Sequence, residues 1–536
     1  MQKLFLKTKT YFESHEKFKE FILLLSIFLI SLFIRRIGLK HGFPLLTHPD
    51  EPTIINPVLR MTSLKTLNPG NFNRPNQILY YLNFIYLNLV SFITYGKNVS
   101  LAYDEHYLNF YYHSRLLISI MGSLIPVIAY KIGKEFKPVF GYAAALVFAV
   151  FPLYTLHSLY VTPDIPITLF TFLVIYFILR YLNTGSERYW VFATIFSAIN
   201  TAEKYPGLIS LGIVFAGIAI HIFSNNKTVK LEKFKTLFRY SIKIIITFLI
   251  SLFIFAPFIF IEYQSVIEAL IRESRTTHLG ADNLGWFGNM LFYLKTFFSY
   301  SNFIGILFFG IGLFAIIRSR NIKYLVLMYG FLYWIILSKL ALHWERWALP
   351  MYISPLLLIA IGVTAIWLNF KNNKFVRIVM IVVIGCFFFQ QSVHTLSVPT
   401  RMKYVDTRLV ARRYCEQNGI TTSNSIYEGY TPLQPQHYKL LFDDYLIKDL
   451  NPEYAILSSY IYNRFYVEPE RYAYEISVYD QLRNNNELLQ QIEPDRAPNT
   501  IIEQLNTIIY YTRKQLRLTN EERYTGPTIE IFRIIE

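Results

Sequence analysis

Two adjacent carboxylates, Asp50 and Glu51, lie between prolines in the segment His48-Pro49-Asp50-Glu51-Pro52. Proline fixes its own backbone and restricts the residue before it, so these acidic side chains are held in place where the chain leaves or enters a helix. Asp164 also has prolines close on either side. Carboxylates that are held in this way suit proton abstraction from a hydroxyl group or the binding of a cation.

The elements that must position these carboxylates are membrane helices. The chain of 536 residues is 53% hydrophobic and 17% aromatic, and its apolar runs of about 18 residues or more are longer than a water-soluble core needs. Its formal net charge is +16, but the basic residues lie in short loops between apolar runs, where membrane insertion places them. The sequence therefore predicts a polytopic membrane protein, and the charge does not indicate a nucleic-acid partner.

The apolar runs predict an all-α membrane domain with about eleven spanning helices, at residues 1–396. The first run stays as a membrane anchor, because Arg35-Arg36 follows it in place of a small-residue cleavage site. High hydropathy stops after about His394, so we expect a separate domain at residues 397–536. The predicted spans lie at residues 21–35, 116–133, 140–160, 165–181, 189–201, 207–223, 240–261, 297–317, 324–340, 349–368 and 376–394.

One further apolar run, residues 78–94, decides the topology. Polar side chains recur along it at helical spacing, so we expect this helix to lie in the membrane interface of the first outer loop rather than to span. The basic loops then fall on the side of the basic N-terminus, as the positive-inside rule requires. We expect a cytoplasmic N-terminus, an extracytoplasmic C-terminal domain and the cytoplasmic membrane of a prokaryote. The polar side chains are Asn76, Tyr80, Asn83, Ser91 and Thr94.

This topology collects ionisable groups on the noncytoplasmic face. A single such group at the end of a span is more simply explained as a solvated cap. The segregation of many of them to one face indicates a site, and we expect them to line a cavity that opens outward. Besides Asp50, Glu51 and Asp164, they are Glu203, Lys204, Glu273, His278, His343, Glu345 and Arg346.

The order of these motifs resembles the GT-C superfamily of membrane glycosyltransferases, in particular the branch with the protein O-mannosyltransferases and the bacterial aminoarabinose transferases that modify lipid A. The resemblance covers the membrane domain nearly end to end. Residues 273–280 and the polar C-terminal region are also similar to bacterial members. The motifs are Asp50-Glu51 after the first apolar helix, Arg74-Pro75 before the interfacial helix, Arg115 opening the second span, Asp164, and Lys204-Tyr205-Pro206-Gly207.

The resemblance implies a sugar donor carried on a polyprenyl phosphate, and transfer with inversion at the anomeric carbon to an acceptor hydroxyl on the outer face. The acceptor stays open between protein, lipid and envelope glycan, and the sugar between a hexose and a pentose. Such a donor suits the location, because nucleotide sugars are not supplied outside the cytoplasmic membrane whereas a lipid-linked sugar can enter between helices. Release of the anionic lipid phosphate then requires positive side chains.

By the same resemblance, Asp50 is the general base on the acceptor hydroxyl, and Glu51 orients the acceptor or shares that role. Asp164 matches the second acidic position of the family pattern, where it would bind sugar hydroxyls, the acceptor or a divalent cation. Lys204 and Arg346 are expected to bind the lipid phosphate, since ammonium and guanidinium groups neutralise the charge that grows on it.

Other roles stay open. Arg74 and Arg115 are weaker candidates for the phosphate, because snorkelling to the membrane interface explains them equally well. The chain also departs from the family at Glu203-Lys204-Tyr205, where relatives often carry Thr-Lys-Gly, so analogy supports Lys204 less strongly. A divalent cation is a possible cofactor without any ligand spacing to support it; its candidate ligands are Asp50, Asp164, His278 and His343.

The polar region after the membrane domain predicts a small α/β domain. A helix is expected from Thr407 to Gln417, where Asn418-Gly419 gives a stop signal, and short strands are expected at residues 425–427, 454–457 and 528–533. No nucleophile elbow, phosphate-binding glycine loop or zinc pattern occurs there. We expect this domain to recognise the acceptor or to cover the active-site cavity, and a structural cap is the alternative.

Rival functions come from other classes. A transporter or flippase of lipids or glycans would also be polytopic and basic, but its coupling carboxylates should lie near the middle of the membrane, where this sequence is nearly free of ionisable groups. A scaffold gives no reason for acidic and basic groups to gather at separate outer loops. An O-antigen ligase or polymerase also acts on polyprenyl-linked glycans, but it is not expected to carry the Asp-Glu pair after the first span.

Overall fold

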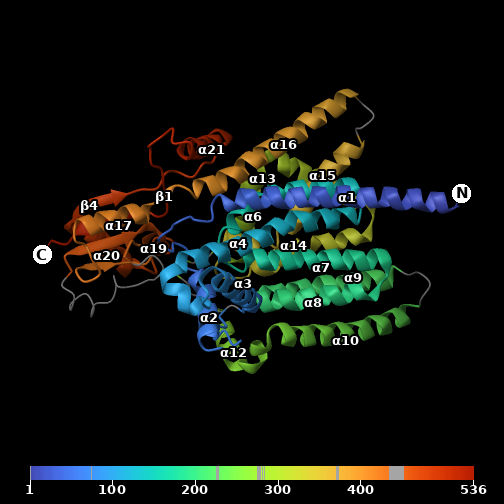
Figure 1. The fold of residues 1–536 in the computed structure, drawn as a ribbon, viewed down its shortest axis with the longest axis horizontal. Helices are drawn as coiled ribbons and strands as arrows, with labels where there is room; N and C mark the ends of the chain where they lie inside the picture. The colour runs from blue at the N-terminus through green and yellow to red at the C-terminus, as the bar shows by residue number, and fades with distance from the viewer. Residues whose placement is uncertain are drawn as a thin grey trace.

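The computed structural model describes residues 2–73, 75–224, 229–273, 279–280, 282, 284–369, 374–433 and 452–535, and it describes side chains from residue 17 onward, that of Glu273 excepted. Long helices run side by side in a bundle, and a small domain containing strands lies at one end of it (Figure 1). The predicted fold class, a helical membrane domain followed by a small α/β domain, is confirmed. The domain boundary predicted between residues 396 and 397 stays a prediction. In the structure α16 continues to Arg401, and the first strand begins at Val405.

Every predicted span coincides with helical residues of the bundle. Several helices extend beyond the predicted limits, because polar residues continue the helix past the apolar run. The helices and 3₁₀ turns of the bundle are α1 (Gln2–Arg36), α2 (Pro52–Ser63), α3 (Gln77–Tyr95), α4 (Val99–Lys134), α5 (Pro138–Ala149), α6 (Pro152–His157), α7 (Asp164–Thr184), α8 (Glu187–Glu203), η1 (Tyr205–Ser210), α9 (Leu211–Phe223), α10 (Lys230–Phe255), α11 (Pro257–Ile261), α12 (Tyr263–Glu273), α13 (Gly285–Ser319), η2 (Ile322–Met328), α14 (Tyr329–Leu337), η3 (Glu345–Ala348), α15 (Ile353–Asn369) and α16 (Lys374–Arg401).

Within the described residues, seven helices are long and apolar enough to cross a membrane, and three shorter apolar helices accompany them. The prediction of about eleven spans also counted runs below this length, such as those of α8 with 17 residues and α5 with 12. Such short helices fit a bundle whose neighbours cover their ends. The chain is a multi-pass membrane protein.

Helix α3 has the length and hydropathy of a span, but both of its ends contact the same end of the bundle. Near its start, the backbone N–H of Leu79 donates to the carboxylate of Glu203, the last residue of α8 (2.9 Å). Toward its end, the Asn88 amide donates to the hydroxyl of Thr62 in α2 (3.0 Å). A spanning helix would bring its ends to opposite ends of the bundle, whereas α3 is foreshortened beside α2 in Figure 1. This is the arrangement predicted for an interfacial helix.

Three breaks interrupt long helical runs. The predicted span at residues 140–160 is divided into α5 and α6, and Pro152, which has no N–H to donate, begins the second of them. Helix α4 leaves helical geometry at His106 (φ −132°, ψ 21°), and α13 does so at Asn302 (φ 53°, ψ 173°). At the second break the Asn302 side chain accepts from the N–H of Gly305 (2.9 Å), which caps the helix that follows.

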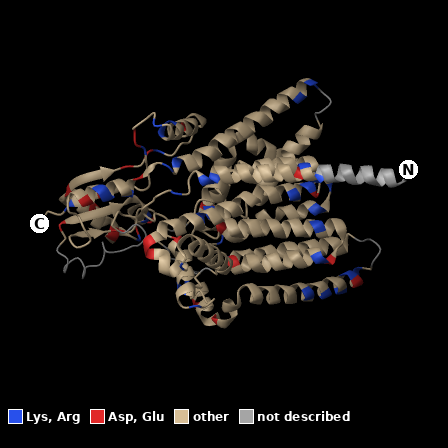
Figure 2. Cartoon of the chain, viewed as in Figure 1, with Lys and Arg blue, Asp and Glu red and all other residues tan. Residues whose placement is uncertain are grey.

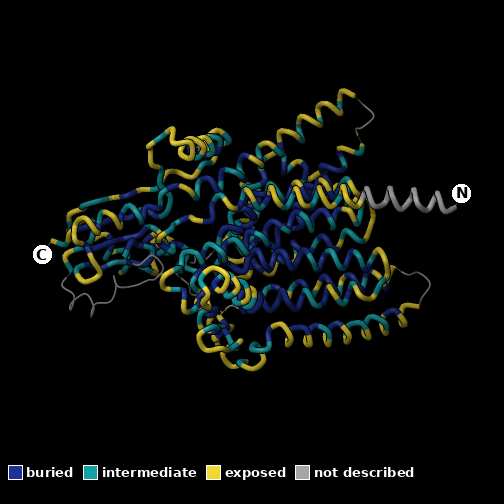
Figure 3. The backbone as a smooth tube through the Cα atoms, in the orientation of Figure 1, coloured by how far each residue is buried: buried dark blue, intermediate teal, exposed yellow. Residues whose placement is uncertain are grey.

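Helices at the rim of the bundle expose apolar side chains. Figure 3 shows buried residues concentrated in the middle of the bundle and many exposed ones along α10 and α16. In water such a surface would cost about 25 cal/mol for each Å² of apolar area, whereas bilayer hydrocarbon solvates it. This rim therefore faces lipid. On α10 the exposed side chains include Ile246, Leu249, Ile250, Phe253 and Ile254.

The C-terminal domain is built on a four-stranded sheet of order β2-β3-β6-β4, in which β2 and β3 are parallel and β6 is antiparallel to both of its neighbours. The predicted strands correspond to β2, β3 and β6, and the predicted helix is α17 with the same limits. Strands β1, β4 and β5 were not predicted. The elements are β1 (Val405–Asp406), α17 (Thr407–Gln417), β2 (Ser425–Tyr427), β3 (Tyr454–Ser458), α19 (Ser459–Phe465), α20 (Ala473–Asn485), β4 (Glu487–Ile492), α21 (Ile501–Gln515), β5 (Tyr524–Thr525) and β6 (Ile529–Arg533).

Helices cover both faces of this sheet, because successive residues of a strand point to opposite sides. On β3, Ala455 and Leu457 pack in one apolar cluster with residues of α19 and α20. Ile456, between them, packs in a second cluster with Ala411 and Cys415 of α17. The short apolar strands thus form the middle layer of a three-layer domain.

The C-terminal domain contacts the loop that follows α1. Arg408 makes two hydrogen bonds to the Asp406 carboxylate (both 2.8 Å), and its third nitrogen donates to the backbone carbonyl of Thr47 (3.1 Å). Arg408 and Asp406 are buried. Because Thr47 lies three positions before Asp50, the C-terminal domain helps to hold the loop that carries the first predicted catalytic residue.

Candidate active site

Asp50 lies in the turn that leads into α2, where Pro52 occupies the first turn of the helix. The backbone N–H and the hydroxyl of Thr53 donate to the Asp50 carbonyl (3.2 and 2.6 Å). The Asp50 N–H in turn donates to Nδ1 of His48 (3.3 Å). These bonds hold the Asp50 backbone on both sides, while the carboxylate remains 17% exposed. The proline spacing had predicted such a held carboxylate.

Four ionisable side chains from distant segments meet at this turn. Nη1 of Arg346 lies 2.7 Å from Oδ2 of Asp50, and its Nε lies 3.8 Å from Oδ2 of Asp164. Nζ of Lys204 donates to Oδ1 of Asp164 (2.7 Å). Two carboxylates and two cations thus alternate along one chain of ion pairs. The structure brings together the residues that the sequence proposed as base, second acid and phosphate ligands.

Asp164 is the first residue of α7, and its carboxylate is 3% exposed. Pro163 precedes it and Pro166 follows two positions later, so the start of the helix is fixed at this point. The helix dipole favours a negative charge at this end by about 0.3–1 kcal/mol at exposed sites. With Lys204 and Arg346 beside it, the buried carboxylate is held in its ionised form, in which it can orient both cations.

Lys204 follows the last residue of α8 in an extended conformation (φ −155°, ψ 133°). The chain then turns back at once, because the Gly207 N–H donates to the Lys204 carbonyl (2.7 Å). A Cβ on Gly207 would lie 2.1 Å from the carbonyl oxygen of Asn200, so glycine is required there. The Tyr205 hydroxyl donates to the Phe72 carbonyl (3.2 Å). The aromatic residue therefore fastens the first outer loop and leaves Lys204 directed at Asp164.

Arg346 lies in the 3₁₀ turn η3, between two tryptophans. Its guanidinium lies 5.8 Å from the ring of Trp344, and Nζ of Lys204 lies 5.5 Å from the ring of Trp347. Such contacts with ring faces favour a cation by about 0.5–1 kcal/mol at exposed sites. The adjacent Glu345 points elsewhere and accepts from the hydroxyl of Tyr300 (3.1 Å). Burial raises the pKa of Glu345, so this carboxyl group holds its proton more tightly than usual.

Glu51 and Arg115 form a separate pair beneath the turn. Nε and Nη2 of Arg115 donate to the two carboxylate oxygens of Glu51 (2.8 and 2.6 Å), and both side chains are 0% exposed. Arg115 also donates to the carbonyls of Leu39 and His41 (2.8 and 2.9 Å), and the Val161 N–H donates to Glu51 (3.2 Å). The pair therefore ties the loop after α1 to α4 and to the loop before α7.

Glu203 was predicted among the outer-face groups but without a role in the site, and His48 was not predicted as a site residue. Besides its bond to Leu79, the Glu203 carbonyl accepts from the N–H of Asn76 (2.9 Å), so this residue joins α8 to the start of α3. The ring of His48 lies 4.4 Å from that of Tyr160, and burial lowers its pKa. Two features of the sequence could have indicated roles for these residues. His48 lies two residues before Asp50, and Glu203 lies beside Lys204.

The remaining predicted residues lie away from the ion pairs or outside the described residues. Nε2 of His343 lies 3.4 Å from Oδ2 of Asp282, and its ring lies 4.1 Å from that of Phe292. Glu273 is the last residue of α12, and its side chain is not among those described. Arg74 and His278 lie outside the described residues.

The sequence left a divalent cation open as a possible cofactor of this site. Within the described part of the chain, no group of three or more His, Cys, Asp and Glu side chains is arranged to hold a metal ion. Both candidate carboxylates, Asp50 and Asp164, already face the guanidinium of Arg346, and His343 faces Asp282 instead. A second positive charge between the two carboxylates would be repelled by Arg346. The described residues therefore do not fit a resident metal ion.

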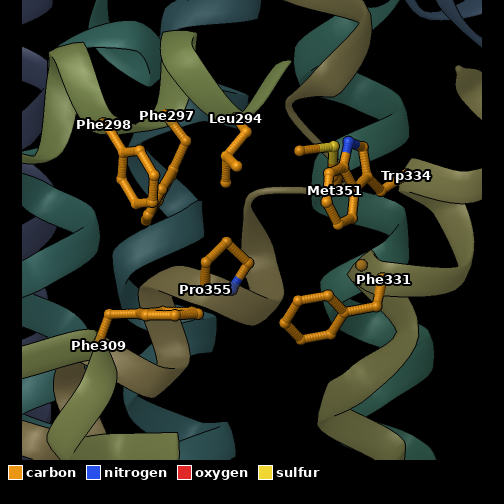
Figure 4. A pocket seen from close by; sticks show the side chains of 9 residues that line it. Leu294, Phe297, Phe298, Phe309, Phe331, Trp334, Met351 and Pro355 are labelled. Carbon is orange, nitrogen blue, oxygen red and sulfur yellow. The ribbon is translucent and has the colours of Figure 1, made fainter. Parts of the chain in front are cut away.

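A small apolar cavity, with about 40 Å³ of space for water-sized molecules, is open on one side. It is formed by α13, α14 and α15, and Figure 4 shows aromatic and aliphatic side chains from these helices directed into a common space. Met351 on its wall follows Arg346 by five residues. The chain thus leads from η3, which carries one of the cations, to the wall of the cavity. Its lining consists of Leu294, Phe297, Phe298, Phe309, Gly330, Phe331, Trp334, Met351 and Pro355.

Comparison of sequences relates part of the bundle to a known family. Residues 112–261 match the family model described as dolichyl-phosphate-mannose-protein mannosyltransferase. This stretch includes Arg115, Asp164 and Lys204. Comparison with curated proteins gave no match.

Comparison of structures extends the similarity over nearly the whole chain. The apo form of the Archaeoglobus fulgidus oligosaccharyltransferase aligns with 95% of this chain and 88% of its own, at 10% identity and a TM-score of 0.52. Its complex with Zn and sulfate aligns over the same shares at 12% identity and a TM-score of 0.52. ArnT from Cupriavidus metallidurans bound to undecaprenyl phosphate aligns with 74% of this chain and 72% of its own, at 13% identity and a TM-score of 0.47. At these identities the oligosaccharyltransferase match shows a shared fold.

Proposed function

We propose, from the premise that this chain is a glycosyltransferase of GT-C fold, that it transfers a sugar from a polyprenyl-phosphate donor to an acceptor hydroxyl with inversion at the anomeric carbon. The observation that carries the proposal is the meeting of Asp50 with Arg346, Asp164 and Lys204 at one end of the bundle. A partly exposed carboxylate beside two cations and an apolar cavity provides the parts that such a transfer needs.

Lys204 and Arg346 are the proposed ligands of the donor phosphate. In the structure they neutralise Asp50 and Asp164, so two positive charges balance two negative ones. A phosphate between the cations would exchange these ion pairs for charge-assisted bonds to its own oxygens. The cations gain most when the sugar leaves, because the lipid phosphate then acquires a further negative charge. Electrostatic stabilisation of the leaving group is therefore their proposed role.

The polyprenyl chain is proposed to enter the apolar cavity between α13, α14 and α15. Aromatic and aliphatic side chains line it, and exposed apolar side chains such as Phe303 and Leu307 continue the surface along α13. Burial of an isoprenoid chain there would be driven by the same hydrophobic term that inserts lipid tails. The donor would thus lie with its tail among helices and its phosphate at Arg346.

Asp50 is the proposed general base. As the acceptor oxygen forms a bond to the anomeric carbon, the bond from that carbon to the phosphate oxygen breaks and its electron pair leaves with the lipid phosphate. The acceptor proton passes to the Asp50 carboxylate, which keeps the charge balanced. Arg346 contacts Asp50 (2.7 Å). The same guanidinium would therefore contact both the general base and the leaving phosphate.

The other predicted residues receive positioning roles. Glu51 and Arg115 are proposed to hold the loop under Asp50 rather than to contact acceptor or phosphate, because each satisfies the other in a fully buried pair. Asp164 is proposed to orient Lys204 and Arg346. Arg74, which precedes α3, remains a proposed further phosphate ligand.

The reaction is proposed to occur on the outer face of the cytoplasmic membrane. In Figure 2 Lys and Arg residues mark the end of the bundle opposite the C-terminal domain, on helices such as α10 and α16. That distribution supports a cytoplasmic location for the basic end, by the positive-inside rule. The ion-paired site and the C-terminal domain lie at the other end, which would face outward.

The test is transfer of radiolabelled sugar from purified polyprenyl-phosphate sugars to envelope extract. Asp50→Asn, which keeps the shape of the side chain, should abolish transfer at equal expression and equal unfolding midpoint. Asp104→Asn is the matched control, since Asp104 is exposed on α4 near the same end of the bundle. Equal activity of Asp50→Asn and wild type would remove Asp50 from its role. If the wild-type protein transfers no sugar from any donor of a panel but moves lipid-linked sugar between the leaflets of vesicles, the result would favour transport.

A further inference from the structure

Helix α21 in the C-terminal domain has the reverse of the polarity expected for a helix on a water-soluble domain. Its buried side chains are Gln504, Thr507 and Tyr510, which are 5%, 3% and 7% exposed. Ile502 and Ile509, by contrast, are 68% and 52% exposed. A helix that covers a soluble core normally buries its aliphatic residues and exposes its amides and hydroxyls.

The exposed aliphatic residues of α21 form a stripe. Ile502 and Ile509 are seven positions apart in α21, and Leu516, which caps the end of the helix, follows after seven more. Seven residues make nearly two helical turns, so the three side chains lie on one side. Leu516 and the nearby Leu518 are 63% and 64% exposed. The helix itself is well defined, because Thr500 and Glu503 form a capping box at its start. Ile502 and Ile509 therefore lie on a regular helix and not on a frayed end.

The surroundings of α21 indicate what covers this stripe. The helix packs beside α16, and the ring of Tyr510 lies 5.2 Å from that of Tyr404, just beyond the end of α16. Along α16, apolar side chains up to Phe389 are exposed as on a lipid-facing helix. In Figure 1 α21 lies beside α16 at the end of the bundle that also carries α2, α3 and α12. The stripe thus continues the lipid-facing surface of the bundle where α16 leaves it.

The charges around the stripe suit phospholipid headgroups. Arg513, Lys514 and Arg517 are exposed at the C-terminal end of the helix. Glu503 lies at the other end, where it caps the helix. Aliphatic side chains flanked by basic ones are typical of helices that lie in a membrane interface, with the apolar face among acyl chains and the cations near phosphates.

We infer that α21 lies on the outer surface of the bilayer, with Ile502, Ile509 and Leu516 among the lipids, and so fastens the C-terminal domain to the membrane beside α16. The occupant of the stripe is the phospholipid bilayer that holds the bundle. The domain then has a second attachment to the membrane besides the chain itself. Its position relative to the loop that carries Asp50, where Arg408 donates to the Thr47 carbonyl, would depend on that attachment.

The experiment measures where a spin label on α21 lies in the full-length protein, reconstituted in vesicles of phosphatidylethanolamine and phosphatidylglycerol. Cys386, which is exposed, is replaced by alanine, and the buried Cys415 is kept. The label is attached at Ile509→Cys. The matched control is Leu488→Cys on β4, in the same domain, where the native side chain is 47% exposed. Power saturation with oxygen and with a water-soluble nickel chelate then compares access from lipid with access from water.

We expect the label at position 509 to gain relaxation by oxygen and to lose most of its relaxation by the nickel chelate, relative to the label at 488. Equal access of the nickel chelate to both labels would place α21 in water and overturn the inference. Exclusion of both reagents from position 509 would also overturn it, because a protein surface, such as a second copy of the chain, would then cover the stripe. Both positions are exposed, so neither variant disturbs a core.

Discussion

Replacing Arg115 by methionine should destabilise the protein through the charge it leaves behind. Glu51 would lose two charge-assisted hydrogen bonds (2.8 and 2.6 Å) and keep the longer bond from Val161 (3.2 Å). Each bond to a charged group is worth about 1.5–3 kcal/mol, and both side chains are 0% exposed. The free energy of unfolding should therefore fall by about 3–5 kcal/mol, as for one lost partner of a buried ion pair.

The double variant Glu51→Gln/Arg115→Met separates this cause from lost packing. It buries no charge, so we expect it to be less destabilised than the sum of the two single variants, with a coupling of about 1–3 kcal/mol. The assay follows the unfolding midpoint of purified protein in detergent by gel filtration after heating. Lys97→Met, at an exposed position before α4, should leave the midpoint unchanged. Additive losses, or an Arg115→Met variant as stable as wild type, would refute the reasoning.

Three further predictions concern single residues. Lys204→Ala should lower kcat/KM for a polyprenyl-phosphate sugar about tenfold or more, mainly through kcat, since a charge-assisted bond is worth about 1.5–3 kcal/mol. Lys204→Arg should restore part of the loss, and an unchanged kcat/KM in the alanine variant would contradict this role. Gly207→Ala would bring a Cβ within 2.1 Å of the carbonyl oxygen of Asn200. The free energy of unfolding should therefore fall by about 1–3 kcal/mol, which a lower unfolding midpoint would report. An unchanged midpoint would show that the turn can relax. Burial raises the pKa of Glu428 in the C-terminal domain to about 8. The folded state therefore favours the protonated carboxyl, and this stabilisation is lost as the pH rises from about 4.5 to about 8. Glu428→Gln should flatten the decline of the unfolding midpoint with pH, and a variant with the wild-type slope would count against this explanation.

Much of the fold could be predicted because its signals lie in residues that are neighbours in the sequence. Apolar runs of membrane length mark helices whatever their neighbours are, and each predicted span coincides with helical residues. Local stop signals were equally reliable, as the agreement between the predicted and observed limits of α17 shows. The interfacial position of α3 followed from a polar stripe, although its length and hydropathy alone suit a span.

The chemical roles within the site were harder to predict, because contacts between distant residues have no local signal. No local pattern could decide that Glu51 faces Arg115 while its neighbour Asp50 faces Arg346. Adjacent side chains at the start of a helix point in different directions, and which direction meets a cation depends on how helices pack. The sequence likewise placed Glu203 on the outer face but could not predict its contact with Leu79, which joins α8 to α3.

By itself the sequence determined a polytopic helical membrane protein with a small α/β domain, and its motifs resembled the GT-C superfamily, a resemblance that the family model and the shared fold confirm. Hydrophobic length, charge between spans and proline spacing are properties of neighbouring residues, so they can be read without coordinates. Only the tertiary structure decided which of the outer charges pair, because Asp50, Asp164, Lys204 and Arg346 are far apart in the chain and meet through helix packing. The same holds for α21, whose exposed aliphatic stripe becomes visible once the fold shows which of its faces is covered.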